Sequence, residues 1–182
     1  MRRTFALIVA VAVGLMAAPA VGGNPNAVEW VETDVMGVQT DVVTRLAGDW
    51  IHERFSREGT FTAEAGGFTY TGTVGWEAAG KVKLDEEGDF PVFGTFRGKG
   101  MYVFDNESDP VGGPMAGTTC RLTLQSKLVE DSPVFPPFVF YGNQVAHCDN
   151  GSTIHGRIFG PTGNTLGQWR GFDQIVTGTL KN

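Results

Sequence analysis

The sequence predicts an all-β protein, a single antiparallel β-barrel of about eight or nine strands, with a two-sheet β-sandwich as the alternative. Three observations support this prediction. Apolar and polar residues alternate with period two along most of the chain, helical periodicity is scarce, and many of the 26 glycines lie inside the alternating segments. Glycine permits the sharp coiling of strands at barrel corners, and closure removes exposed sheet edges. The barrel is therefore favoured over the sandwich.

Alternation defines the expected strands in order along the chain. In residues 67–76, aromatic residues share one face and threonines the other, as in a half-buried strand. Residues 118–129 repeat this pattern and place Cys120 on the inward face. The other expected strands are 49–55, 59–64, 80–84, 93–104, 138–148, 152–159 and 167–180. Turn residues such as Asn150-Gly151 tolerate positive φ, so we expect antiparallel hairpins in a meander.

The first twenty residues have the features of a cleaved signal peptide. Two arginines precede an apolar run from Phe5 to Ala18, and small residues up to Ala20 suit a signal peptidase. About 14 apolar residues would rise only about 21 Å as a helix, against a hydrocarbon core of about 30 Å. We therefore expect a secreted or periplasmic protein with no stable membrane insertion after cleavage.

These patterns divide the chain into a signal peptide (residues 1–20), an N-terminal segment of uncertain structure (21–47) and a barrel domain (48–182). Within the middle segment, residues 41–46 suit either a helical turn or a first strand, and both remain open. The three prolines in residues 131–137 cannot donate ladder hydrogen bonds, so this stretch predicts a long hairpin loop or an edge excursion.

The charge of the mature chain is acidic. Loss of Arg2 and Arg3 from the 14 basic residues leaves 12 against 20 acidic ones, a net charge of −8. Such a surface repels nucleic acid and anionic lipid, so we expect no nucleic-acid partner. Acids gather at 85–89 and 105–109 beside turn-forming residues, which indicates solvated loop tips.

The two cysteines, Cys120 and Cys148, allow a single pairing. An oxidising compartment favours a disulfide between them, and a loop of this length stabilises the fold by roughly 3.5 kcal/mol in the chain-entropy model. Antiparallel pairing of the two strands would place Leu122 opposite Ala146. We therefore expect a cross-strand disulfide.

Gly48-Asp49-Trp50, followed by an amphipathic strand, resembles the Gly-x-Trp opening of lipocalins and other calycin barrels. The resemblance covers three residues, and the family's middle Thr-Asp-Tyr signature is absent. It implies a barrel in which Trp50 seals the closed end and Arg170 packs over it. It supports the barrel topology more than any class of ligand.

No catalytic residue can be assigned from the sequence. The histidines and acids have no spacing that a known mechanism requires. A pair of acids could flank a cleft as in glycosidases, the candidates being Glu29, Glu32, Asp34, Glu53 and Glu64. A metal site formed by His52, His147 and His155 would require three strands to converge. We expect no cofactor and assign no metal site, and leave open whether the histidines or acidic clusters bind a metal.

The function predicted from the sequence is a secreted or periplasmic binding module for a small, largely apolar ligand. Inward aromatic residues would line the site, namely Phe68, Tyr70, Trp76, Phe96, Tyr102 and Phe104. The same residues could instead fill a core, and a cavity of the order of several hundred Å³ would separate these cases. The alternatives are a barrel-mouth enzyme (a cyclase, isomerase or hydrolase) and a secreted structural or interaction protein. The oligomeric state is not indicated.

Overall fold

The computed structural model describes residues 27–37, 40–87, 91–130, 138–162 and 173–181, and its regular elements are all β-strands. They are β1 (Ala27–Met36), β2 (Thr40–Ala47), β3 (Trp50–Ala65), β4 (Phe68–Leu84), β5 (Pro91–Asp109), β6 (Thr119–Glu130), β7 (Phe138–Cys148), β8 (Thr153–Thr162) and β9 (Asp173–Lys181). The predicted all-β class is confirmed.

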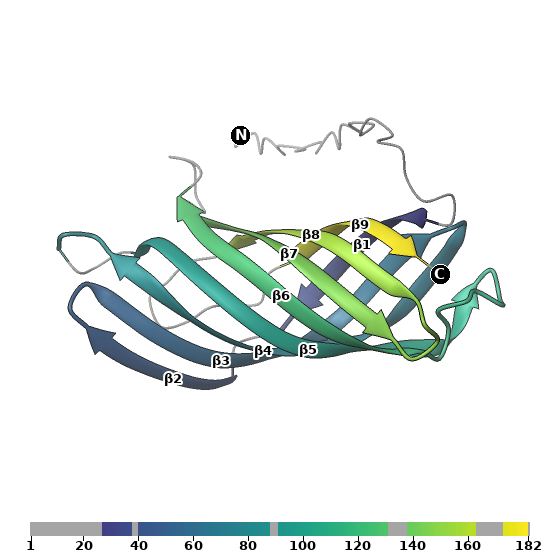
Figure 1. Ribbon diagram of the computed structural model, residues 1–182, viewed down its shortest axis with the longest axis horizontal. Helices are drawn as coiled ribbons and strands as arrows, with labels where there is room; N and C mark the ends of the chain where they lie inside the picture. The colour runs from purple at the N-terminus through teal and green to yellow at the C-terminus, as the bar shows by residue number, and fades with distance from the viewer. Residues whose placement is uncertain (1–26, 38–39, 88–90, 131–137, 163–172, 182) are drawn as a thin grey trace, which may run out of the picture.

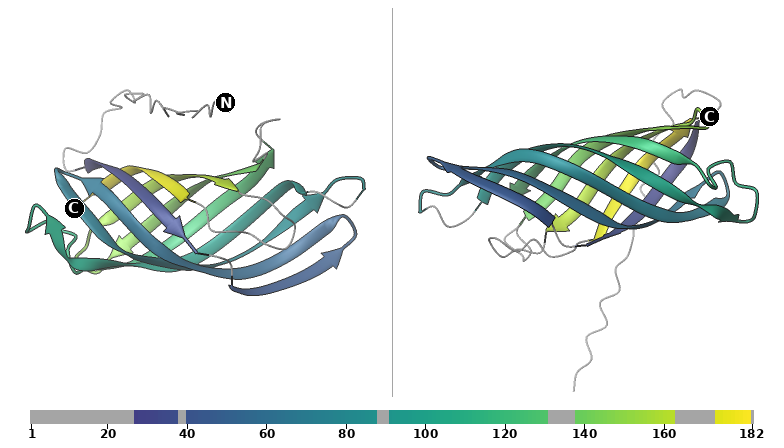
Figure 2. Two further views of the ribbon diagram at one scale, coloured as in Figure 1. Left: turned by 180° about the vertical axis from the view of Figure 1, so that it is seen from behind. Right: turned by 90° about the horizontal axis from the view of Figure 1, so that it is seen from below.

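Eight of these strands form a closed antiparallel barrel. The strand order is β1-β9-β8-β7-β6-β5-β4-β3-β2, and β1 closes the ring by pairing with β3, for example Asp34 with Phe61. Strand β2 pairs with the first part of β3, beyond the segment that β1 covers. Figures 1 and 2 show the long strands β3, β4 and β5 running past the closed ring, with β2 along their outer edge. The barrel prediction is therefore confirmed, and the sandwich alternative is wrong.

The segment whose structure the sequence left open contributes β1 and β2. On β1, the residues from Trp30 to Met36 alternate strictly between buried and exposed. Two of the buried positions are occupied by the acids Glu32 and Asp34. The alternation of buried and exposed positions on β1 is therefore not visible in the sequence as an alternation of apolar and polar residues. The barrel thus begins N-terminal to the boundary expected at residue 48. Residues 1–20 and the proline-rich stretch 131–137 lie outside the described residues.

Glycines at inward positions let neighbouring strands approach closely. A Cβ atom on Gly100 of β5 would collide with the carbonyl oxygen of Gly75, and one on Gly178 of β9 with the carbonyl oxygen of His155. These positions therefore require glycine because backbone occupies the space of a side chain. This agrees with the role expected for glycine in strand coiling.

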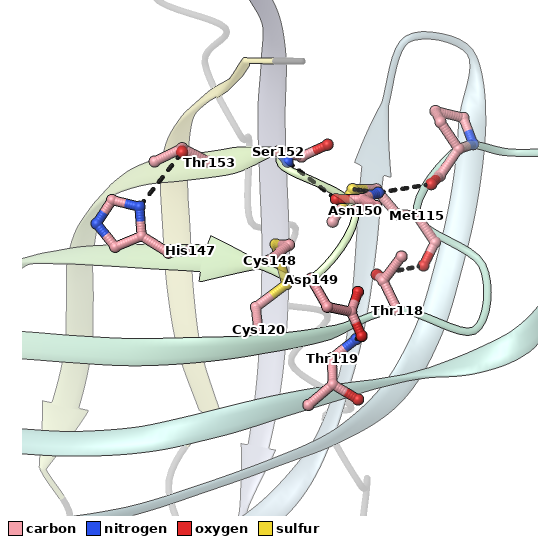
Figure 3. The surroundings of a disulfide bond; sticks show 11 residues. Met115, Thr118, Thr119, Cys120, His147, Cys148, Asp149, Asn150, Ser152 and Thr153 are labelled. Atoms are coloured by element: carbon pink, nitrogen blue, oxygen red, sulfur yellow. Dashed lines mark hydrogen bonds between the residues drawn. A yellow bond between two sulfur atoms is a disulfide. The ribbon is translucent and has the colours of Figure 1, made fainter.

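A disulfide between Cys120 and Cys148 joins β6 to β7 (Figure 3). The two cysteines face each other in the ladder, and Leu122 lies opposite Ala146, as the sequence predicts. The turn that follows β7 has Gly151 at φ 88° and a hydrogen bond from the Ser152 amide to Asn150 Oδ1 at 2.9 Å.

The bond is confirmed, and it indicates an oxidising compartment, extracellular or periplasmic. No helix among the described residues could span a membrane.

Candidate functional site

The six aromatic residues predicted to bind a ligand all lie on β4 and β5 and point into the barrel. Their rings pack on one another: Tyr70 and Phe104 are 6.0 Å apart between centroids, and Tyr102 and Phe104 are 6.2 Å apart. Phe61 of β3 adds edge-to-face contacts at 5.1 Å to Tyr102 and 4.9 Å to Phe104. Such geometry is typical of an aromatic core.

The enclosed space beside these rings is small. A cavity of about 20 Å³ borders Trp76, Phe96 and Gln174. Pockets that hold small molecules have volumes of about 300–1,000 Å³, whereas a single water needs roughly 10–15 Å³. Ligand binding by the six aromatic residues stays a prediction, and the packing favours a core role for them.

A polar cluster lies inside the barrel next to the aromatic core. Strand β1 carries Glu32 and Asp34 inward on successive positions of one face, and both side chains have 0% exposure. Trp30 Nε1 donates a hydrogen bond to Glu32 Oε2 at 2.7 Å, and the Tyr102 hydroxyl donates to Glu32 Oε1 at 2.6 Å. Glu32 is thus held as a hydrogen-bond acceptor.

Two glutamines extend the cluster across the barrel. Gln144 Nε2 of β7 donates to the Tyr102 hydroxyl at 2.6 Å, and Gln174 Nε2 of β9 donates to Asp34 Oδ2 at 2.9 Å. The cluster therefore links β1, β5, β7 and β9, and Asp34 and Gln174 are 140 positions apart in sequence. Only closure of the barrel brings these side chains together.

Burial favours the protonated form of both carboxyl groups. Burial, and then the charge of Glu32, raise the pKa of Asp34 to about 11, and burial also raises the pKa of Glu32. A hydrogen bond joins the two groups, which requires that one of them is protonated. Asp34 keeps the proton, since Glu32 already accepts from Trp30 and Tyr102. The Tyr102 pKa is raised, again mainly by burial, so its phenol stays neutral.

A buried cation is also present inside the barrel. Arg57 on β3 is 1% exposed, and burial lowers its pKa to about 10. Its guanidinium therefore remains charged at neutral pH.

Of the five acids considered as a catalytic pair, the structure brings together Glu32 and Asp34. Glu29 and Glu64 are exposed on the outer face, and Glu53 is half-buried with a pKa raised by burial. A glycosidase requires room for a sugar between its two carboxyl groups. The hydrogen-bonded Glu32–Asp34 pair leaves no such room, so its geometry suits holding a proton inside the fold.

A second feature is a groove of about 710 Å³ on the outer surface of β3 to β7. Two rows of outward side chains border it, and the backbone between the rows, including Gly80 and Gly142, forms its floor. One row runs His52, Lys81, Thr95, Lys127 and Tyr141, and the other runs Ala79, Arg97, Gln125 and Asn143.

The groove is basic although the chain has a net charge of −6. Its lining includes Lys81, Arg97 and Lys127, and no acid is present among the described residues that line it. The nearby Glu77 is engaged by Arg54, with Nη2 to Oε2 at 3.2 Å. Acids gather instead at the β4–β5 turn and the end of β5. Charge is therefore segregated on this molecule.

Aromatic rings flank the groove. Tyr141 and Phe159, 40% and 39% exposed, contact each other with ring centroids 5.3 Å apart. Trp50 lies on the outer face with Lys81 Nζ 4.5 Å from its ring centroid. This differs from the interior position that the calycin resemblance implies, because Trp50 precedes the closed part of the barrel. Arg170 lies outside the described residues.

The histidines do not converge. His52 lines the groove on β3, whereas His147 and His155 are exposed on β7 and β8. His147 Nδ1 lies 3.4 Å from the Thr153 hydroxyl (Figure 3). Among the residues that the structure describes, no group of three or more His, Cys, Asp or Glu side chains could hold a metal ion.

Comparison of the chain with protein-family models, with curated proteins and with solved structures finds no match.

Proposed function

We propose that this protein is an exported binding module whose ligand is an anion held in the outer groove, in place of the apolar ligand expected inside the barrel. The observation that carries the proposal is a groove of about 710 Å³ with three cationic side chains and no acid among its described lining residues. Its volume falls within the range of small-molecule sites.

The groove suits binding better than catalysis. Lys81, Arg97 and Lys127 offer fixed positive charge, and Gln125 and Asn143 offer hydrogen bonds. The groups with strongly raised pKa, Asp34 and Tyr102, are buried inside the barrel, away from this lining. A barrel enzyme would need such groups to reach a substrate.

Two independent features support export. The disulfide indicates an oxidising compartment, and residues 1–20 carry the pattern of a cleaved signal. Intact-mass measurement of protein recovered from its own host is expected to show a chain beginning near residue 21. A chain that retains residues 1–20 inside the cell would contradict export.

Anion binding is tested with 8-aminopyrene-1,3,6-trisulfonate, a small fluorescent polyanion, by fluorescence anisotropy at low salt. Replacing Lys81→Gln and Lys127→Gln together removes two charges from the groove lining. Two exposed charge contacts of about 0.5–1 kcal/mol each correspond to a loss of affinity of roughly tenfold.

The matched control replaces Lys99→Gln and Lys181→Gln, two exposed lysines that are not part of the groove lining. This variant has the same net charge as the groove variant, and its affinity is expected to stay within about twofold of the parent. Equal weakening of both variants, or no binding by the parent protein, would overturn the proposal.

A further inference from the structure

We propose that the occupant of the outer groove is an acidic polysaccharide, a linear chain of carboxylated or sulfated sugars. This inference rests on the proposed function, and it names the ligand class. It depends on the order of charges across the strands, on the neutral polar side chains between them and on an exposed aromatic ring.

The cations follow the strands one by one. Lys81 on β4, Arg97 on β5 and Lys127 on β6 all point outward, alternating between the two adjacent rows of the ladder. Neighbouring strands lie about 4.8 Å apart, so these three strands present one positive charge each over about 10 Å. Arg54 on β3 also points outward, but it is paired with Glu77. Arg157 on β8 continues the Arg97 row through Gln125 and Asn143.

A line of regularly spaced cations matches a linear polymer with a charge on each unit. A single compact anion would contact two or three of these side chains and leave the others unused. The advance per sugar residue in an extended polysaccharide is close to the spacing between strands, so successive acidic sugars would meet successive cations. The groove lies on the outer surface of the barrel, so a polymer can approach it from the side without a chain end entering first.

The neutral residues of the groove fit sugar hydroxyls. Thr95, Gln125 and Asn143 lie between the cations in the two rows. Their side chains offer both donors and acceptors, as hydroxyl groups require. A surface that bound its ligand through charge alone would not need these neutral donors and acceptors.

Tyr141 supplies a platform at the far end of the row that contains Lys81 and Lys127. Its ring is 40% exposed and is braced by Phe159 at 5.3 Å. The C–H face of a sugar ring covers such an aromatic surface well, because tyrosine combines apolar area with a polar tip.

Single-stranded nucleic acid is the competing polymer, since it also combines cationic grooves with aromatic stacking. One observation favours the polysaccharide. Tyr141 is the one exposed aromatic ring among the described residues of the lining, and it packs against Phe159 instead of standing apart to receive successive bases.

The test measures binding by isothermal calorimetry at one ionic strength to polygalacturonate, dextran sulfate, neutral dextran and a thymidine oligonucleotide. We expect binding to polygalacturonate or dextran sulfate, and the stronger of the two identifies the acidic group. We expect no binding to neutral dextran and weaker binding to the oligonucleotide. The Lys81→Gln/Lys127→Gln variant is expected to lose polysaccharide binding, while the Lys99→Gln/Lys181→Gln control retains it.

Variants of Tyr141 separate a sugar platform from a purely charged surface. Tyr141→Ala is expected to lower the affinity for the acidic polysaccharide by roughly fivefold. The affinity of Tyr141→Phe, which keeps the ring, is expected to stay within about twofold of the parent protein. Equal effects of the two variants on the polysaccharide would contradict the role of the ring.

The outcomes distinguish this inference from the proposed function. Binding of the trisulfonate without binding of either acidic polysaccharide would overturn the inference and leave anion binding intact. Tighter binding of the oligonucleotide would identify nucleic acid as the occupant and overturn the inference. Absence of binding to the trisulfonate and to every polymer would overturn both.

Discussion

Glu32 and Asp34 place two carboxyl groups in the interior of the barrel, where a charged pair would be strongly destabilising. The structure avoids this cost by retaining one proton on Asp34 and surrounding Glu32 with the donors Trp30 and Tyr102. A folded state that holds a proton which the unfolded chain releases must lose stability as the pH rises.

Replacement of Asp34→Asn tests this coupling. The ordinary pKa of aspartate is about 3.9, and that of folded Asp34 is about 11. Between these values the native state binds the extra proton, so the free energy of unfolding falls with rising pH by up to about 1.4 kcal/mol per unit. An asparagine amide can donate to Glu32 and accept from Gln174 without a titrating proton.

Urea unfolding between pH 5 and 9 is the measurement. We expect a steep decline in stability for the parent protein, a flatter curve for Asp34→Asn, and greater stability of the variant at the alkaline end. Glu64→Gln, at an exposed acid on β3, serves as the control and is expected to keep the parent slope. Parallel curves for the parent protein and Asp34→Asn would show that Asp34 does not hold the proton.

At the scale of elements, most strands are predictable from alternation, and the exceptions have a physical cause. The strands that contain Cys120 and Cys148 form in the expected register, because most of their inward residues are small or apolar. Strand β1 is not predicted, because charged residues occupy inward positions that a hydrophobic pattern reads as solvent-exposed. Burial of these acids depends on partners from β5, β7 and β9.

The glycines of β4 and β5 give a prediction about strand coiling. Gly100→Ala places a methyl group against the carbonyl oxygen of Gly75 and the backbone of Trp76, and is expected to destabilise the fold by about 1–3 kcal/mol. Gly75→Ala is the matched control on the neighbouring strand. Its added methyl group would lie 3.5 Å from Glu58 Cγ, an ordinary van der Waals contact. We therefore expect the free energy of unfolding to change by no more than about 0.5 kcal/mol.

The midpoint of urea unfolding, with an unchanged m value, reports both changes. If Gly100→Ala is as stable as the parent protein, the close approach of β4 and β5 does not constrain the barrel.

At the scale of the whole molecule, net charge and local charge have opposite signs. The chain carries 20 acids against 14 basic residues, yet cations dominate the outer face of β4 to β8. The acidic composition led to the expectation of a surface that repels nucleic acid and anionic lipid. The basic groove could not be predicted from composition, because composition does not show on which face of a strand a side chain lies.

The dependence of polyanion binding on salt tests whether the local charge of the groove or the net charge of the protein controls affinity. If the groove governs the interaction, affinity for the tighter-binding acidic polysaccharide falls as sodium chloride is raised from about 50 to 500 mM. Added salt shortens the Debye length, which is about 10 Å at 0.1 M and about 3 Å at 1 M, and so weakens the attraction between exposed charges. If net charge governed it, screening would relieve repulsion and affinity would rise. Calorimetry over this range distinguishes the two by the sign of the change.

The sequence by itself determined the all-β class, most strand positions, the disulfide and the inward placement of the aromatic residues. These depend on local alternation and on a single possible pairing of cysteines. Only the tertiary structure decided that β1 closes the ring, that Glu32 and Asp34 are buried inside it, and that Lys81, Arg97 and Lys127 line one groove. Each of these features depends on which strands become neighbours and in which register, so residues far apart in the chain acquire their chemistry only when the barrel closes.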